Sequence, residues 1–225
     1  MSNELKNFPL FKSLWLKVKE PDNVALIFVN DDGSDERITY ARIFENTNRL
    51  SRALIKAGVG EGDTFALLMR NHPEFLYGLA AALSLGAIGV PIDPRSKGAK
   101  LSFQINNTKS KGIIVSDEFI GSIKEIENDI KGVPVIGVAY KKHHKISVDS
   151  AYPALNDIFS HESGSLPDKA LPMKLSRPLQ VIHTSGTTGD PKGVILRGQR
   201  LRDSAILGKL IYKYKSDDIL YNGLS

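Results

Sequence analysis

The chain of 225 residues contains no cysteine, which excludes disulfide bonds, thiolate metal sites and a cysteine nucleophile. Residues 1–6 contain neither a basic cluster nor an apolar core of the signal-peptide type, and this favours a cytoplasmic location. A long uncharged stretch covers residues 75–92, but Gly86 and Gly89 interrupt it and it includes Pro91. We therefore expect a buried helix followed by a strand there, and no transmembrane span.

The chain has only a small excess of positive charge. It contains 30 Lys and Arg residues and 25 Asp and Glu residues, which gives a formal net charge of +5. A positive charge of this size suits a polyanionic ligand such as ATP or coenzyme A, and it suits RNA equally. No basic motif with interleaved aromatic residues occurs, so we expect no nucleic-acid partner. With 41% apolar and 24% charged residues, the composition is that of a soluble globular protein with a substantial core.

Strand-like and helix-like patterns alternate through the middle of the sequence. Apolar runs typical of buried strands occur at 64–69, 87–92, 112–115 and 133–138, and apolar residues at helical spacing occur at 73–85, 97–108 and 118–130. Continuous apolar strands separated by helices indicate a parallel sheet covered on both faces. We therefore predict an α/β fold with a doubly wound, mostly parallel sheet flanked by helices. Further on, the patterns predict a helix at 151–159, strands at 178–183 and 193–196, a helix at 199–214 and a strand that begins at Asp217.

The first part of the chain has a different pattern. Apolar residues at helical spacing predict an amphipathic helix over residues 8–20, and the segments 24–29 and 37–39 predict a hairpin. We accordingly divide the chain into an N-terminal helix and hairpin, residues 1–38, and an α/β subdomain, residues 39–225.

A helix is also predicted where the α/β subdomain begins. Thr39 is a suitable N-cap for it, and Gly58 is a suitable terminator. Ile43, Leu50 and Leu54 fall on one face of this segment, so the helix should pack against the core.

The most specific stretch is the ten-residue run from Thr184 to Gly193, Thr-Ser-Gly-Thr-Thr-Gly-Asp-Pro-Lys-Gly, which lies between two apolar segments that we interpret as buried strands. Glycines without a Cβ let the backbone approach an anion closely, while hydroxyl and amide N–H groups donate to phosphate oxygens. In a Walker-type loop the lysine directly follows a glycine and opens a helix, whereas Lys192 lies between Pro191 and Gly193. The run therefore predicts a phosphate-binding loop of another kind.

This run resembles the signature phosphate loop of the adenylate-forming enzymes, which include acyl- and aryl-CoA synthetases, luciferases and the adenylation domains of peptide synthetases. All nine defined positions of their pattern, Thr-Ser-Gly-Thr-Thr-Gly-x-Pro-Lys-Gly, are matched. Segments similar to the early core of these enzymes also occur at 39–50, 60–69, 73–91 and 217–218. The resemblance covers most of residues 36–225, and it implies the N-terminal portion of the large domain of the acyl-CoA synthetase/luciferase fold.

The resemblance also implies which residues bind the nucleotide. The loop residues expected to hold the phosphates are Thr184, Ser185, Gly186, Thr187, Thr188, Gly189 and Lys192. Their hydroxyl groups would donate hydrogen bonds, the two glycines would expose the backbone, and Lys192 would supply charge. The implied ligands are ATP with Mg²⁺, a carboxylic acid, and coenzyme A as co-substrate. No residue stands out as a nucleophile, a general base or a metal ligand.

Members of this family are normally much longer than this chain. Further downstream they carry an aromatic and glycine segment that forms the acyl and adenine pocket, a Thr-Glu pair for magnesium, an Asp for the ribose, and a small C-terminal domain with a Lys. None of these motifs occurs here. We therefore expect an N-terminal fragment that lacks the second sheet, the barrel and the small C-terminal domain, and that is inactive alone. Apolar surface left uncovered in this way is expected to cause self-association.

The chemistry that the resemblance implies is a two-step ligation. A carboxylate attacks the α-phosphorus of ATP to give an acyl-adenylate and pyrophosphate, and a thiol then displaces AMP. Two alternatives stay open, an amino-acid-adenylating domain that feeds a carrier protein and a non-enzymatic module that binds a nucleotide or a partner. The acid is unspecified.

A few residues outside the loop carry weaker signals. His183 stands where the family usually has an aromatic residue, and we interpret it as a strand-end residue without a catalytic role. Residues 197–200 stand where many members have a Ser/Thr-His pair. Arg197, Arg200 and Arg202 are candidates for the phosphates of coenzyme A, although a solvated helix face is the default explanation for them. The segment 70–72 could face a ligand, and the Lys and His residues of 141–145 are expected to form a surface loop rather than a metal site.

Overall fold

The computed structural model describes residues 20–30, 32–130, 132–141, 149, 151–171, 174–184, 191–215 and 218–222. In chain order, the helices and strands in these ranges are β1 (Val24–Val29), β2 (Asp35–Thr39), α2 (Tyr40–Lys56), β3 (Thr64–Leu68), α3 (Pro73–Leu85), β4 (Ile88–Pro91), α4 (Gly98–Asn107), β5 (Ile113–Ser116), η2 (Asp117–Phe119), α5 (Ile120–Glu125), β6 (Val135–Ala139), α6 (Leu155–His161), β7 (Pro178–Thr184), β8 (Lys192–Arg197) and α7 (Gly198–Tyr212). The helix predicted over residues 8–20 lies outside the described residues, apart from its last position.

The N-terminal hairpin is confirmed. Strands β1 and β2 form a separate antiparallel two-stranded sheet, and helix α2 begins directly after β2. The side chain of Thr39 accepts a hydrogen bond of 3.2 Å from the backbone N–H of Arg42, as expected of an N-cap. At the other end Gly58 has φ +80°, and the N–H of Val59 donates to the carbonyl of Leu54 over 2.9 Å, which closes the helix.

The main sheet has six strands in the order β6-β5-β3-β4-β7-β8. All neighbours pair in parallel except β7 and β8, which form an antiparallel hairpin. From the central strand β3 the chain moves first to β4 on one side and then to β5 on the other, so the strand order reverses at β3. This arrangement confirms the prediction of a mostly parallel sheet flanked by helices.

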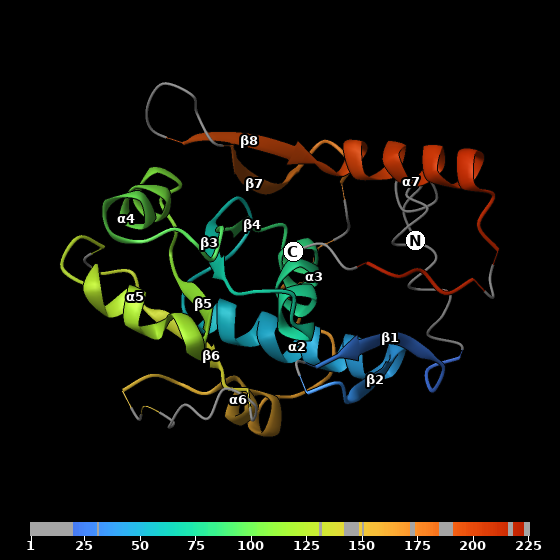
Figure 1. The fold of residues 1–225 in the computed structure, drawn as a ribbon, viewed down its shortest axis with the longest axis horizontal. Helices are drawn as coiled ribbons and strands as arrows, with labels where there is room; N and C mark the ends of the chain where they lie inside the picture. Colours follow the sequence, from blue (N-terminus) through green and yellow to red (C-terminus); the bar gives the residue numbers. More distant parts are fainter. Residues whose placement is uncertain are drawn as a thin grey trace.

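Helices lie on both faces of the main sheet (Figure 1), and an apolar core lies between the sheet and the helices on each face. Phe65 and Leu67 of β3 point to the core that contains residues of α2, α3 and α6, whereas Ala66 and Leu68 point to the core that contains residues of α4 and α5. The four side chains are fully buried. This alternation follows from the two-residue period of a strand, and it explains why β3 has no polar residue between its ends.

The uncharged stretch of residues 75–92 forms most of helix α3 and strand β4, as predicted. Helix α3 begins with Pro73 at its first turn and ends at Gly86, whose φ is +66°. Proline is favoured at the start of a helix, and glycine at a left-handed terminator. No described helix is long and apolar enough to cross a membrane.

Three predictions made from the sequence need correction. The helix expected over 118–130 is limited to η2 and α5, and Ile126 and Ile130 are buried by turns that follow it. Strand β8 was expected to be buried, but it forms the edge of the sheet and most of its side chains are exposed. Residues 218–222, where a last strand was expected, form no strand because they pair with no neighbour. Asp217 lies outside the described residues.

Candidate functional site

The β7–β8 hairpin holds the two ends of the expected phosphate loop together. Thr184 is the last residue of β7 and pairs with Lys192, the first residue of β8. The hydroxyl of Thr184 donates to the carbonyl of Lys192 over 3.3 Å, and both side chains are exposed. The other expected phosphate-binding residues, Ser185, Gly186, Thr187, Thr188 and Gly189, lie outside the described residues. The structure therefore fixes where the loop leaves and rejoins the sheet.

A cavity of about 470 Å³ lies beside the point where the loop leaves β7. Strands β3, β4, β5 and β7 are parallel, so their carboxyl ends meet at one edge of the sheet, here called the carboxyl edge. The cavity is lined by residues that come at or just after these ends, namely Met69, Arg70, Asn71, Phe75, Pro91, Ile92, Asp93, Pro94, Arg95, Phe119, Ile182 and His183. In open α/β sheets ligands bind at this edge, near the point where the strand order reverses.

His183 contributes an imidazole ring to the cavity wall. Its two ring nitrogens are buried, and neither has a hydrogen-bond partner within the described residues. Burial lowers the pKa of His183, because an imidazolium ion would lose its hydration without gaining an opposite charge. The sequence predicted that His183 lies at the end of a strand. In the structure its ring also lines a ligand-sized cavity.

Two arginines lie at the rim of the same cavity. The Arg95 guanidinium bonds to the Asp93 carboxylate over 2.8 Å, and the side-chain and backbone hydrogen bonds from Arg95 lower the pKa of Asp93 to about 2. The Arg70 guanidinium bonds to Glu118 over 3.0 Å and lies 5.9 Å from the ring centre of Phe119. Both arginine side chains remain largely exposed, at 91% and 65%, so each can also meet an anion from solvent.

The sequence analysis singled out Arg70 and Asn71, and both line the cavity, whereas Asp93, Arg95 and Phe119 were missed. Asp93 and Arg95 follow the strand that was predicted at 87–92. A polar pair directly after a buried strand was therefore a signal that could have been used.

The remaining sequence candidates lie outside the cavity. Arg197 donates to the carbonyl of Ser176 over 2.9 Å, and Arg202 pairs with Asp203 over 2.7 Å, so neither lines the carboxyl-edge cavity. Lys141 forms an ion pair of 2.5 Å with Glu74, while residues 142–145 lie outside the described ranges. Within the described residues, no group of three or more His, Cys, Asp or Glu side chains could hold a metal ion.

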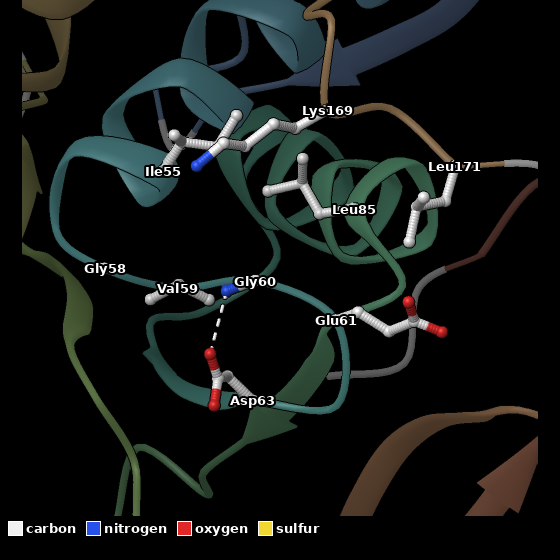
Figure 2. A pocket seen from close by; sticks show the side chains of 9 residues that line it. All are labelled: Ile55, Gly58, Val59, Gly60, Glu61, Asp63, Leu85, Lys169 and Leu171. Atoms are coloured by element: carbon white, nitrogen blue, oxygen red, sulfur yellow. Dashed lines mark hydrogen bonds between the residues drawn. The ribbon is translucent and has the colours of Figure 1, made fainter.

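A second cavity, of about 400 Å³, lies at the opposite edge of the sheet, where strand β3 begins (Figure 2). It is lined by Ile55, Gly58, Val59, Gly60, Glu61, Asp63, Leu85, Lys169 and Leu171. Its floor is the turn before β3, in which the carboxylate of Asp63 accepts a hydrogen bond of 2.9 Å from the N–H of Gly60. The ammonium group of Lys111 lies 2.8 Å from the Asp63 carboxylate and lowers the pKa of Asp63. This ion pair stabilises the turn and leaves the carboxylate already paired. The cavity is remote from the loop.

Comparisons with known proteins relate nearly the whole chain to one family. A family model described as AMP-binding enzyme matches residues 15–223. The chain is 29% identical to the acetyl-coenzyme A synthetase of Penicillium chrysogenum, over 92% of this chain and 32% of that protein. It is 26% identical to the crotonobetaine/carnitine–CoA ligase of Salmonella heidelberg, over 88% of this chain and 38% of that protein. The chain thus spans about a third of the length of these curated relatives.

Solved structures show the same fold. The anthranilate CoA ligase AuaEII in complex with anthranoyl-AMP matches 86% of this chain with a TM-score of 0.75 at 22% sequence identity. ATP-bound MatB from Rhodopseudomonas palustris matches 97% of this chain with a TM-score of 0.75 at 20% identity. This chain covers 35% and 39% of those two chains. Because the family model extends over nearly the whole sequence, the chain belongs to the AMP-binding enzymes.

Proposed function

We propose that the chain is the N-terminal part of an ATP-dependent acid–thiol ligase, an acyl-CoA synthetase that forms an acyl-adenylate and then an acyl-CoA. In the first step a carboxylate oxygen attacks the α-phosphorus of ATP and pyrophosphate leaves. In the second step a thiol attacks the acyl carbon and AMP leaves. The relatives that support the proposal are named as CoA ligases or synthetases of different carboxylic acids. The proposal therefore names no particular acid.

One observation carries the proposal. The hairpin pairs Thr184 with Lys192 at the carboxyl edge, so the signature loop leaves and rejoins the sheet next to a ligand-sized cavity. In this proposal the loop residues hold the β- and γ-phosphates in line for departure, and Lys192 reduces the negative charge that builds on pyrophosphate. Such a loop acts through positioning and charge stabilisation, with no covalent step of its own.

Mg²⁺ and coenzyme A belong to the same proposal. The carboxylates of Asp93 and Glu118 at the carboxyl edge are already paired with arginines, so the described residues offer no ready-made metal cage. Mg²⁺ is commonly held by one or two carboxylates together with substrate phosphates, so in this reading it arrives with ATP and neutralises phosphate charge. The cytoplasmic location expected from the sequence is likewise part of the proposal.

The test is ATP–pyrophosphate exchange by the full product of the gene, over a panel of short, long and aromatic acids. Lys192→Ala should slow adenylation by about a hundredfold and thiolation far less, because pyrophosphate leaves only in the first step. Lys169→Ala is the matched control, since Lys169 is an exposed lysine at the opposite edge. Equal slowing of both half-reactions by Lys192→Ala would contradict the assigned role.

The isolated 225-residue chain should not catalyse exchange, because it lacks the downstream motifs for ribose and for adenylate formation. Steady exchange by the pure chain would show that the fragment is active. ATP binding by the gene product without exchange for any acid would favour the non-enzymatic nucleotide-binding module instead. Exchange with amino acids alone would favour an adenylation domain that feeds a carrier protein.

A further inference from the structure

The cavity at the edge of the sheet where β3 begins, here called the amino-edge cavity, has an apolar wall and a charged rim (Figure 2). The end of α2, the turn before β3, the end of α3 and the segment 169–171 meet there, and their apolar side chains are Ile55, Val59, Leu85 and Leu171. Val59 and Leu85 are only 2% exposed, whereas Glu61 and Lys169 at the rim are exposed. Water gains few hydrogen bonds from such a wall, which therefore favours the apolar body of a ligand.

Backbone hydrogen bonds hold the walls of this cavity in place. The N–H of Gly62 donates to the carbonyl of Gly86 over 2.9 Å, which ties the turn before β3 to the end of α3. The N–H of Leu171 donates to the carbonyl of Ser84 over 2.7 Å, which ties the segment 169–171 to the same helix. Because these contacts do not depend on a ligand, the cavity is preformed, as small-molecule sites usually are.

The two acidic side chains of the amino-edge cavity already have partners. Glu61 forms an ion pair of 2.6 Å with Arg177, and Asp63 forms one of 2.8 Å with Lys111. A cationic ligand would have to displace one of these basic side chains in order to reach a carboxylate. The acidic residues therefore do not favour a cation.

The helix ends at the cavity do not favour a cation either. Helices α2 and α3 both end there, and unpaired carbonyls at the carboxyl end of a helix attract positive charge. Here the chain itself donates to the carbonyls at both ends. Backbone N–H groups bond over 2.7 to 3.0 Å to the carbonyls of Leu54, Ile55, Ser84 and Gly86.

Lys169 supplies the charge that remains at the rim. Its side chain is exposed, and the part of the chain that the structure describes gives it no ion pair. Figure 2 shows this side chain extending towards Ile55, whereas the carboxylate of Glu61 points away from it. An ammonium group beside an apolar wall suits a ligand with an anionic head and an apolar body.

The volume of the cavity limits the size of this ligand. Water in the liquid occupies about 30 Å³ per molecule, so the cavity of about 400 Å³ holds roughly ten to thirteen non-hydrogen atoms. We propose that the amino-edge cavity binds a small carboxylate with an apolar body of about six to ten carbon atoms, whose body packs on Ile55, Leu85 and Leu171 and whose head meets Lys169. The site lies at the opposite edge from the proposed ATP site, and it has no part in the ligase reaction.

The experiment titrates the full product of the gene with octanoate in the absence of ATP, by calorimetry and by amide hydrogen exchange. Octanoate should bind at this cavity with a dissociation constant of about 1 mM, as expected of a ligand of this size. Octanol and octylamine should bind at least about threefold more weakly, because neither carries a negative charge for Lys169. Saturating octanoate should slow amide exchange at Gly62 and Leu171 at least about threefold.

Two variants separate the charge from the apolar wall. Lys169→Ala should weaken octanoate binding at least about threefold and leave octanol binding unchanged. Lys174→Ala is the matched control, because Lys174 is an exposed lysine on the same connection but does not line the cavity. Ile55→Trp should fill the cavity and weaken the binding of both ligands at least about tenfold, with thermal unfolding as the check that this variant is folded.

Three results would overturn the proposal. The first is the absence of saturable octanoate binding. The second is octanoate binding that Lys169→Ala leaves unchanged, since the ammonium group would then select no anion. The third is octanoate binding that Arg95→Ala weakens and Ile55→Trp does not, which would place the ligand in the carboxyl-edge cavity. Because the titration contains no ATP, a failure of the ligase proposal leaves this test unaffected.

Discussion

Three glycine-to-alanine substitutions separate backbone strain from side-chain crowding around the main sheet. Gly86 ends helix α3 with φ +66°, and a Cβ built there would lie 3.2 Å from Leu171 and 3.3 Å from Arg177. Gly62 has φ +80° with no atom within 4 Å of such a Cβ. Gly121 lies inside helix α5, where the space is open and φ is not in the left-handed region.

The expected effects follow from these differences. The left-handed conformation costs an alanine about 1–2 kcal/mol, partly offset by about 0.4–1 kcal/mol because alanine restricts the unfolded chain. Gly62→Ala should therefore destabilise the fold by roughly 1 kcal/mol. Gly86→Ala should lower the free energy of unfolding by about 1–2 kcal/mol, because Leu171 and Arg177 must shift by a few tenths of an ångström in addition to the backbone strain. Gly121→Ala should stabilise it by about 0.5–1 kcal/mol through helix propensity.

The assay is urea unfolding followed by circular dichroism, with thermal unfolding as a second measure. A loss of 1–2 kcal/mol in a chain of this size lowers the melting temperature by roughly 2–8 °C. Equal stability of the Gly86→Ala and Gly121→Ala variants would refute the argument from strain. A Gly62→Ala variant less stable than Gly86→Ala would refute the contribution of crowding by Leu171 and Arg177.

Three further predictions concern the carboxyl edge and the core. Wild-type stability should fall as the pH drops through about 6.5, because His183 takes up a proton more readily in the unfolded chain than in the folded one. The urea midpoints at pH 7.5 and pH 5.5 should therefore differ less for His183→Phe than for the wild type. An equal difference in the two proteins would count against burial of the imidazole. The folded pKa of Asp93 is lowered to about 2, so its pairing with Arg95 stabilises the fold above about pH 4, the ordinary pKa of an Asp, and is lost as the pH falls towards 2. Asp93→Asn should lose less stability than wild type between pH 5 and 2.5, and a parallel loss would show that the pair contributes nothing. Leu67→Ala, at a fully buried position, should lower the free energy of unfolding by about 2–5 kcal/mol, measured with urea. A loss below about 1 kcal/mol would mean that the core between the sheet and α2, α3 and α6 is loosely packed.

Much of the fold could be predicted from the sequence where local signals and tertiary context agree. Pro73 and Gly86 fixed both ends of α3, because the first suits a helix start and the second a left-handed terminator. The apolar run of β3 predicted a strand buried on both faces, since every second residue meets a different core. The signature loop predicted the family from residues that are mostly outside the described ranges.

Other features depend on contacts that no local pattern contains. The apolar residues Ile126 and Ile130 have helical spacing, yet turns bury them after α5 has ended. The run Val194-Ile195-Leu196 has the composition of a buried strand, but its place at the sheet edge is set by strand order. The wall formed by Asp93, Arg95 and His183 could not be assembled from sequence alone, because Asp93 and Arg95 follow β4 whereas His183 lies in β7, far along the chain.

The ladders of the main sheet differ greatly in length around the phosphate loop. Strands β3 and β4 share four residue pairs, and β7 and β8 share six, whereas β4 and β7 share the single pair Gly89 and Gln180. The hairpin is thus joined to the rest of the sheet by far fewer paired residues than join its own two strands. Because α7 begins directly after β8, the strand that carries Lys192 continues into the helix without a connecting loop.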